Sequence, residues 1–263
     1  MILEAKKLSV SYQGTKGDVN ALIDISFGVE EGQILGIVGE SGSGKSTFAY
    51  SVLGLLPGNS KKKGSILFKG KDLTFLSDKE LENLRANKIG LIFQEPASTF
   101  NPVLSIGYHF RELLKIKSQG HKVTRSQVEE VIQDSFEKVR LPEPERILKS
   151  YPHQLSGGQL QRIAIAMAIS LKPAVLIADE PTSSLDVTIE SQVIHLFKEL
   201  REKLGFTIVF ITHNLDLVKA LCEKVVVIYQ GRVREITTAS DLFISPQDSY
   251  TKQLLASFKD LEE

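Results

Sequence analysis

The sequence has little cysteine, no excess of either charge and no long apolar run. Cys222 is the single cysteine among 263 residues, which excludes an internal disulfide and a zinc site built on cysteines. It stands among apolar residues, so we expect a small, buried hydrophobic side chain in a reducing compartment. Because 32 basic residues balance 32 acidic residues, the net charge does not favour binding to nucleic acid or to an anionic membrane.

Segments that would carry the chain into or across a membrane are also missing. Residues 1–10 include Glu4, Lys6 and Lys7 and contain no long apolar core, so we do not expect them to form a secretory signal. No apolar run approaches the length of a helix that spans a bilayer. We therefore expect a cytoplasmic chain that reaches a membrane only through a partner.

Apolar and alternating runs predict an α/β chain. Residues 174–178, 207–212 and 224–229 are β-branched runs typical of parallel strands that are covered on both faces. We expect residues 232–237 to pair with the strand before them around Gln230 and Gly231, and the lysines at 61–63 to lie in a solvated loop. The other strands are predicted at residues 2–12, 20–29, 34–38, 65–68 and 89–93.

Helical spacing replaces the strand signals between residues 95 and 171. Thr124 with Gln127 has the form of a capping box, as does Ser77 with Glu80 before this segment. We predict a helical subdomain over 95–171, punctuated on its far side by Pro142, Pro144 and Pro152. Elsewhere helices are predicted at residues 48–56, stopped by Pro57-Gly58, and at 160–171, 187–204 and 250–258.

A glycine-rich turn follows the predicted strand 34–38. Its residues are Gly39, Glu40, Ser41, Gly42, Ser43, Gly44, Lys45, Ser46 and Thr47. Glycines let backbone N–H groups converge on phosphate oxygens, and the start of the next helix adds favourable electrostatics. We expect Lys45 to reach the β- and γ-phosphates and the Ser46 hydroxyl to bind Mg²⁺. The strand, turn and helix together predict a nucleoside triphosphate site.

Polar residues end three of the predicted strands. Asp179 and Glu180 follow the apolar run 174–178, and two carboxylates there would be costly without metal or donor partners. We expect Asp179 to hold the Mg²⁺ shell and Glu180 to polarise the attacking water; the alternative is a surface pair at a strand end. His213 is expected near the same phosphates, although a lone histidine is often structural. Gln94 could contact Mg²⁺ or water.

A second anion-binding helix start is predicted at Leu155-Ser156-Gly157-Gly158-Gln159. Ser156 can cap the following helix, while Gly157 and Gly158 expose backbone donors. Two phosphate-binding helix starts with one hydrolytic glutamate leave two alternatives. Either the chain binds two nucleotides, or one helix start serves a neighbouring chain.

The ordered set of these motifs resembles the nucleotide-binding subunit of an ABC transporter. The set comprises GESGSGKST, Gln94, LSGGQ, AVLIADE, the segment Ser183-Ser184-Leu185-Asp186, and His213. LSGGQ is its most specific part, and the match covers nearly the whole chain. The resemblance implies an α/β, P-loop NTPase (RecA-like) fold, in which a mixed sheet core carries an N-terminal antiparallel β subdomain and an inserted all-helical subdomain. One ABC ATPase domain would span 1–263: core 1–94 and 172–240, helical subdomain 95–171, and a C-terminal helical tail 241–263.

The resemblance also implies roles for single residues. Two cassettes face each other, and each ATP lies between the phosphate loop of one chain and the LSGGQ segment of the other. Tyr12 would stack on adenine, residues 39–47 would hold the triphosphate, and Ser156, Gly157, Gly158 and Gln159 would contact the opposite ATP. Gln94 would bind Mg²⁺ and couple to the membrane subunit. Glu180 would be the general base, His213 the γ-phosphate sensor, and residues 183–186 the loop between subunits.

Several further segments resemble the oligopeptide, dipeptide and nickel importer branch of that family. They are residues 94–96, 98–102, 55–57, 245–246, 250–251 and 254–255. This branch implies a second, different ATPase chain, two transmembrane permeases and an extracytoplasmic solute-binding protein, with this chain peripheral on the cytoplasmic face of the membrane. Short peptides, nickel or another metal chelate, and small oligosaccharides stay open as cargo.

Three other functions are alternatives to an importer ATPase with ATP and Mg²⁺. A soluble ABC ATPase acting on nucleic acid or ribosomes usually has two cassettes, coiled coils or zinc cysteines, none of which is present. An idle regulatory cassette needs a broken motif, and all motifs here are intact. An exporter shares the core motifs, so only the branch resemblance favours import.

Overall fold

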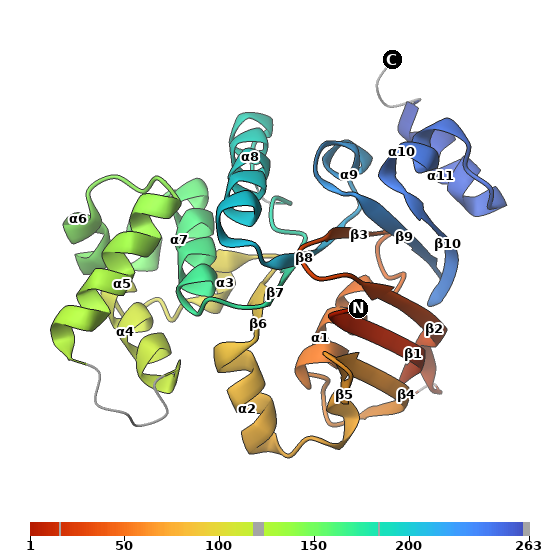
Figure 1. The fold of residues 1–263 in the computed structure, drawn as a ribbon, viewed down its shortest axis with the longest axis horizontal. Coiled ribbons are helices and arrows are strands. Elements are labelled where there is room, and N and C mark those ends of the chain that lie inside the picture. The colour runs from red at the N-terminus through yellow and green to blue at the C-terminus, as the bar shows by residue number, and fades with distance from the viewer. Residues whose placement is uncertain (16, 118–123, 184, 260–263) are drawn as a thin grey trace. The chain divides into compact units, whose positions relative to one another are not determined.

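The computed structural model describes residues 1–15, 17–117, 124–183 and 185–259. Residue contacts divide the chain into two compact units. The first unit comprises Met1–Leu81 and Phe206–Glu263, and the second comprises Glu82–Gly205. Figure 1 traces the order of the elements along the chain. The bounds of the helical subdomain and of the tail remain predictions.

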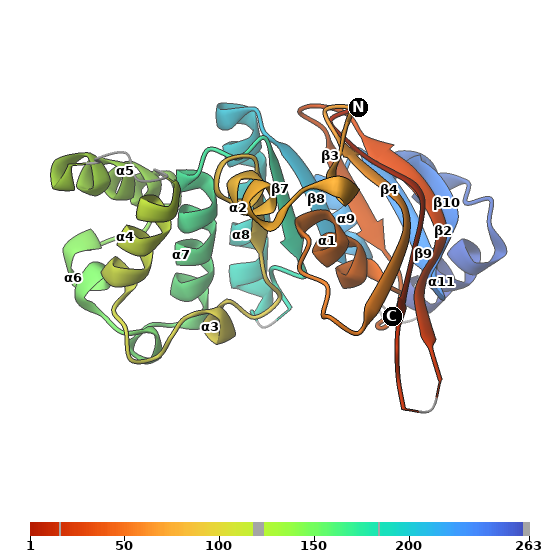
Figure 2. The same ribbon diagram turned by 90° about the horizontal axis from the view of Figure 1, so that it is seen from below.

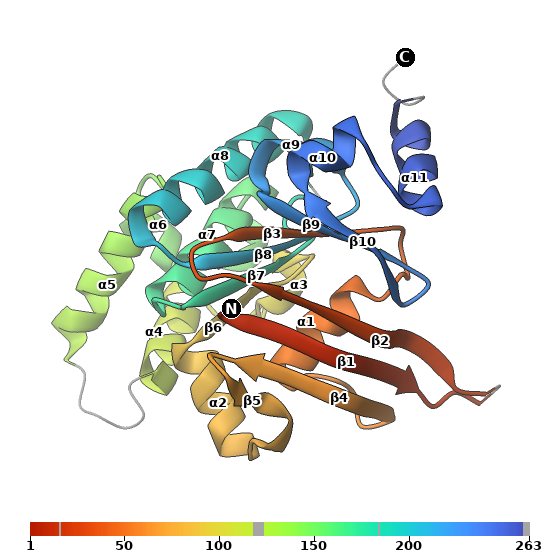
Figure 3. The same cartoon turned by 45° about the vertical axis from the view of Figure 1, so that its right-hand side comes forward.

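The first unit contains an antiparallel sheet with the strand order β2-β1-β4-β5, which Figure 3 shows side by side. The lysines at 61–63 lie in β4 and not in a loop, so that prediction was wrong. Lys62 pairs with Val10 of β1, and the hydrogen bonds of this ladder outweigh the low strand propensity of lysine. The elements are β1 (Leu3–Tyr12), β2 (Val19–Val29), β4 (Ser60–Phe68), β5 (Lys71–Asp72) and a 3₁₀ helix (Leu73–Phe75).

A second sheet of the first unit positions the phosphate loop. The central strand β3 (Ile34–Val38) is parallel to β8 (Thr207–Thr212) and β9 (Lys224–Tyr229), and β10 (Arg232–Thr238) is antiparallel to β9. Every residue of β3 and β8 is buried, as expected for apolar, β-branched strands covered on both faces. The helices of this unit are α1 (Lys45–Leu53), α9 (Leu215–Leu221), α10 (Ala239–Ile244) and α11 (Ser249–Lys259).

Helix α1 ends earlier than Pro57-Gly58, which the sequence predicted as its stop. Gly54 follows the helix in the left-handed conformation (φ 64°), and its N–H group bonds back to Ser51 and Tyr50. A glycine at this position closes a helix without the strain that a Cβ would add. The prediction missed a glycine cap because a proline lay close behind it.

The second unit pairs β6 (Ile89–Ile92) with β7 (Val175–Asp179) in parallel. Every regular element described between these two strands is a helix, and Figure 2 shows α3, α4, α5, α6 and α7 among them. Phe110 of α4 and Phe136 of α5 are fully buried and meet edge to face at 5.4 Å. The helices are α2 (Asp78–Asn87), which crosses the boundary between the units, α3 (Pro96–Thr99), α4 (Ile106–Lys117), α5 (Arg125–Lys138), α6 (Pro144–Lys149), the 3₁₀ turn Pro152–Gln154, α7 (Gly157–Ser170) and α8 (Val187–Leu204).

Local predictions at helix starts are confirmed. Thr124 and Gln127 exchange both bonds of a capping box at α5, and Ser77 and Glu80 do the same at α2.

Cys222 is buried as expected, and burial, with Glu223 nearby, raises the pKa of its thiol to about 12. No helix in the described part of the chain combines the length and apolar character needed to cross a membrane.

Candidate nucleotide site

The phosphate loop leaves β3 through backbone that only glycine fits. At Gly39 (φ 151°) a Cβ would lie 2.0 Å from the carbonyl oxygen of Ile228 on β9. At Gly44 (φ 107°) it would lie 2.3 Å from the carbonyl oxygen of Ala21 on β2. Backbone oxygens cannot move aside as a flexible side chain can, so both glycines are required for the close approach of these segments.

Lys45 is the first residue of α1, and its side chain turns back over the loop. The lysine is only 4% exposed, and its ammonium group donates to the carbonyl oxygens of Gly39 and Glu40, both at 2.8 Å. Buried ammonium groups need such oxygen partners. The positive charge is thereby held beside the first two residues of the phosphate loop.

The start of α1 and the residue before it suit a bound anion. Among the described residues no side chain caps this helix start, and its N-cap is Gly44. The hydroxyl of Ser43 is buried and has no hydrogen-bond partner in the part of the chain that the structure describes. This helix start, the buried hydroxyl and the buried ammonium group together fit a chain of phosphates.

Tyr12 and His213 are two further predicted site residues of the first unit. The Tyr12 hydroxyl donates to the Thr47 hydroxyl at 3.2 Å, which fixes the tyrosine at the far end of the loop. His213 is exposed and directly follows β8. Thr212 and Asn214 shape the turn at His213, because the N–H group of Asn214 donates to the Thr212 hydroxyl at 3.0 Å.

The acidic pair lies at the carboxyl end of β7 in the second unit. Asp179 is the last strand residue and is 1% exposed. Glu180 follows with a positive φ of 44°, which costs energy for a residue with a Cβ and redirects the chain at this point. The amide nitrogen of Gln94, two residues after β6, donates to the Glu180 carboxylate at 3.0 Å. The structure therefore brings together two residues that the sequence predicted independently.

The predicted second helix start is the N-terminus of α7. Ser156 is its N-cap, as predicted, and accepts a hydrogen bond from the N–H group of Gln159 at 3.3 Å. The Gln159 side chain in turn accepts from the N–H group of Ser156 at 3.0 Å. This is a full capping box, which the sequence analysis missed although the serine and glutamine stand three residues apart. Gln159 thus has a structural partner within its own helix.

The two glycines of this segment differ in their surroundings. A Cβ on Gly157 would make an ordinary contact of 3.7 Å with Leu185, whereas one on Gly158 would come within 3.0 Å of Ile189 on α8. The segment before α8 thus packs on the start of α7. Asp186 caps α8 by accepting from the N–H group of Ile189 at 3.0 Å. Of the predicted loop 183–186, Ser184 lies outside the described residues.

One support of the phosphate loop was not predicted. The N–H group of Gly231, in the turn between β9 and β10, donates to the carbonyl oxygen of Ser43 at 3.0 Å. Gln230 and Gly231 both have positive φ, as in the tight two-residue turns of hairpins. The sequence indicated the hairpin at this position but carried no sign of which loop it would contact.

Comparisons with known proteins agree with this geometry. Residues 22–183, more than half of the chain, match the family described as ABC transporter. The dipeptide transport ATP-binding protein of Bacillus subtilis is 44% identical over 264 residues, covering 99% of this chain and 78% of the relative. The oligopeptide transport ATP-binding protein of the same organism is 41% identical over 263 residues, with 99% and 73% covered.

Solved structures are similar in fold as well. An ATP-binding cassette determined as a dimer in a post-hydrolysis state with ADP and Pi has a TM-score of 0.80 and 28% identity, covering 90% of this chain and 98% of that chain. A component of an ABC transporter complex from Clostridium perfringens has a TM-score of 0.76 and 30% identity, with 93% and 91% covered. The fold is therefore the predicted α/β cassette, and the chain belongs to the ABC transporter family as one of its ATP-hydrolysing domains.

Proposed function

We propose that this chain binds and hydrolyses ATP to power the uptake of di- or oligopeptides through partner permeases. The proposal of ATP binding rests on the buried Lys45 ammonium group, in a loop whose Gly39 and Gly44 have no room for a Cβ. The peptide part is supported by the 40–44% identity to peptide transport ATP-binding proteins across almost the whole chain. Nickel or another metal chelate and small oligosaccharides are the alternative cargoes.

The first unit holds the triphosphate in this proposal. The N–H groups of residues 39–47 surround the phosphates, and Lys45 exchanges its bonds to loop carbonyls for bonds to the β- and γ-phosphates. Tyr12 stacks on the adenine, with its hydroxyl held by Thr47. His213 contacts the γ-phosphate from the end of β8. Each of these residues stands at the end of a strand or the start of a helix, where the backbone fixes its direction.

The oxygen atoms of Ser46, Gln94 and Asp179 are the proposed ligands of Mg²⁺. Hydroxyl, amide and carboxylate oxygens are the ligand types that Mg²⁺ prefers, and such sites keep several water molecules. Bound there, Mg²⁺ would neutralise charge on the phosphates. Asp179 suits the role because its carboxylate is almost wholly buried at a strand end.

Glu180 is the proposed general base. The Gln94 amide bonds one carboxylate oxygen at 3.0 Å and thereby fixes the orientation of the group. An oriented carboxylate can accept the proton of a water molecule that attacks the γ-phosphate. Because Gln94 belongs to the segment proposed to face the membrane subunit, the same bond links the hydrolytic residue to that segment.

A second cassette completes the site. Ser156, Gly157, Gly158 and Gln159 would contact the ATP held by a partner cassette, and residues 183–186 would line the same interface. The dimeric cassette bound to ADP and Pi supports this arrangement. ATP then favours the closed pair over the open pair, and only such a difference in affinity can drive the membrane subunits. The proposed partners are a different ATPase chain, two permeases and an extracytoplasmic binding protein, with the chain peripheral on the cytoplasmic face of the membrane.

The first test separates hydrolysis from binding. Glu180→Gln should lower kcat by about 10²–10⁴, the range for a positioned base, while the Kd for ATP stays close to that of the unchanged chain. Glu202→Gln, at an exposed glutamate of α8, is the matched control and should leave both quantities unchanged. Equal kcat in the two variants would remove Glu180 from the proposed role.

The second test addresses the cargo. A strain lacking this chain is supplied with it again, unchanged or as Glu180→Gln, and uptake of a labelled tripeptide, Ni²⁺ and a maltooligosaccharide is measured. Peptide uptake should return only with the unchanged chain, and uptake of the other two should not depend on it. If nickel or oligosaccharide uptake follows the chain instead, the peptide proposal is wrong while the ATPase role stands.

A further inference from the structure

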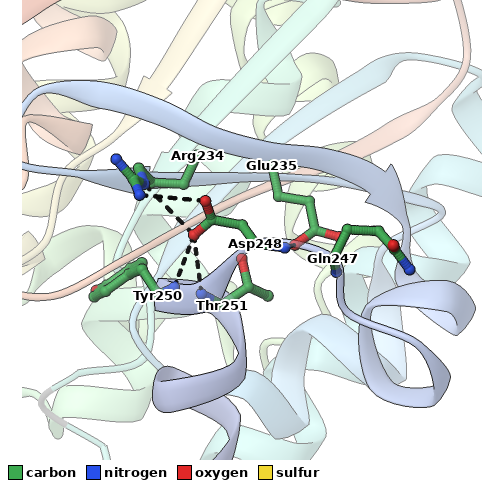
Figure 4. A network of polar contacts seen from close by, with 6 residues as sticks. All are labelled: Arg234, Glu235, Gln247, Asp248, Tyr250 and Thr251. Atoms are coloured by element: carbon green, nitrogen blue, oxygen red, sulfur yellow. Dashed lines mark hydrogen bonds and ion pairs between the residues drawn. The ribbon is translucent and has the colours of Figure 1, made fainter.

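A polar network fixes the start of α11 in the first unit (Figure 4). Asp248 accepts hydrogen bonds from the N–H groups of Tyr250 at 2.8 Å and Thr251 at 3.3 Å. Its carboxylate also pairs with Arg234 of β10 at 3.3 Å. Partial burial acts to raise the pKa of Asp248, but the two N–H donors and Arg234 outweigh it and lower that pKa. The carboxylate therefore stays charged at neutral pH.

The segment before α11 is bound to β10 a second time. Glu235 accepts from the N–H group of Gln247 at 2.9 Å and from that of Asp248 at 3.0 Å, one with each carboxylate oxygen. Hydrogen bonds to charged groups are roughly twice as strong as those between neutral groups. The segment before α11 is therefore bound to β10 by the Glu235 carboxylate and by the ion pair of Asp248 with Arg234.

Tyr250 is the side chain that this network places. It is 6% exposed, and its ring stacks on Tyr229 with the centroids 4.0 Å apart and the planes at 24°. Tyr229 is the last residue of β9 and follows Ile228, the residue whose carbonyl lies against Gly39 of the phosphate loop. The ring of Tyr250 is therefore in contact with the strand end that supports the loop.

The phenol group of Tyr250 lies beside the loop itself. Burial raises the pKa of Tyr250 to about 12; the N–H group of Glu40 acts to lower it, and the Glu40 carboxylate acts to raise it, so the phenol is neutral at neutral pH. Its oxygen is buried and makes no hydrogen bond of normal geometry within the described ranges. A buried hydroxyl with an unmet hydrogen bond next to a carboxylate has one charged neighbour that can satisfy it.

We infer that Tyr250 is a positioning residue for the phosphate loop: stacked on Tyr229, it restrains Glu40, so that α11 is part of the support of the ATP site. The inference rests on the proposed role of residues 39–47 in binding ATP. With the phenol oxygen removed, the Glu40 carboxylate loses its restraint and is free to approach the phosphates, where like charges repel. ATP binding must then also order the loop.

Tyr250→Phe tests the inference, because phenylalanine keeps the stack on Tyr229 and loses only the hydroxyl. The Kd for ATP should rise about three- to tenfold, the effect of one hydrogen bond, with KM rising by the same factor and kcat changing less than about twofold. Lys252→Ala, at an exposed residue of the same helix, is the control and should leave Kd unchanged. An unchanged Kd in Tyr250→Phe overturns the inference.

A double variant with Glu40 distinguishes the proposed restraint of Glu40 from a purely structural role of Tyr250, because only the restraint makes the effect of Tyr250→Phe on Kd depend on Glu40. In a Glu40→Ala background, Tyr250→Phe should raise Kd by less than about twofold, because the group it restrains is gone. Effects that simply add in the double variant contradict the inference. If Tyr250→Phe does not fold, hydrogen exchange on the unchanged chain decides instead: ATP should slow the amides of Tyr250 and Thr251, and equal rates with and without ATP overturn it. Failure of the unchanged chain to bind ATP would reject the proposed function and this inference with it, whereas an unchanged Kd in Tyr250→Phe rejects the inference alone.

Discussion

Two helices of this chain begin with glycine-rich segments that were both predicted to bind anions, yet their starts differ. Helix α1 follows Gly44 and has no side-chain cap among the described residues. Helix α7 follows Ser156 and is closed by a reciprocal capping box with Gln159. Within the described ranges the N-cap of α1 supplies no side-chain bond to its helix start, whereas the N-cap of α7 bonds one of the N–H groups there.

The glycines of the two segments also differ in the space that the fold leaves for a Cβ. Gly39 and Gly44 stand where a Cβ would collide with backbone oxygens of neighbouring strands. Gly157 would tolerate a Cβ at ordinary contact distance. The phosphate loop is therefore glycine-rich for reasons that the folded chain itself explains. At Gly157 the fold gives no such reason, so any requirement for glycine must come from something that binds there.

The largest effect is expected at Gly44. Gly44→Ala places a Cβ 2.3 Å from the carbonyl oxygen of Ala21 at a φ of 107°, so the free energy of unfolding should fall by about 3 kcal/mol or more. Denaturant unfolding measures the change. Gly58→Ala is the matched control, because a Cβ there meets no atom of the described residues within 4 Å, and it should stay within about 0.5 kcal/mol. Equal stability of the two variants would show that the close approach at Gly44 does not matter.

The next effect concerns ligand binding and not stability. Lys45→Ala removes the buried ammonium group, and the Kd for ATP should rise about 100-fold or more, since hydrogen bonds to charged groups contribute about 1.5–3 kcal/mol each. Equilibrium titration with ATP measures it, with the exposed Lys79→Ala as control. Retained affinity in Lys45→Ala would remove the lysine from the proposed site.

Many helix and strand bounds and helix caps could be predicted from the sequence, because they depend on local patterns of residues. The strands 34–38, 207–212 and 224–229 and the helix 187–204 have the bounds predicted from apolar runs and spacing. The caps at Thr124 and Ser156 were also predicted correctly, since a cap depends on residues three positions apart. Patterns of this kind need no knowledge of distant parts of the chain.

What the sequence did not reveal depends on contacts between distant segments. The lysines at 61–63 form a strand because β1 offers them a partner, and no local signal announces that partner. The hydrogen bond from Gly231 to Ser43 likewise joins residues that are far apart in the sequence. The stack of Tyr250 on Tyr229 joins two residues whose spacing in the sequence matches no helix or strand period. Gln94 and Glu180 were each predicted, but only the fold shows the bond between them.

A smaller effect is expected at the cap of α7. Ser156→Ala removes the side chain that accepts from the N–H group of Gln159, and the free energy of unfolding should fall by about 1 kcal/mol. Gln159→Ala removes the other half of the motif, and the double variant should lose less than the sum, because each bond orients the other. Additive losses would show that the two bonds act independently and would weaken the contrast with α1.

The smallest change in stability is expected at Gly157, and it separates the two uses of glycine. Gly157→Ala should shift the free energy of unfolding by no more than about 0.5 kcal/mol, since among the described residues its Cβ meets only Leu185, at 3.7 Å. Gly158→Ala, whose Cβ comes within 3.0 Å of Ile189, is the neighbouring comparison and should cost more. If Gly157→Ala keeps its stability but no longer pairs with a second cassette when ATP is added, the glycine serves the nucleotide of the partner. If stability falls instead, the contrast between the two helix starts is wrong, because both would then need glycine for the fold.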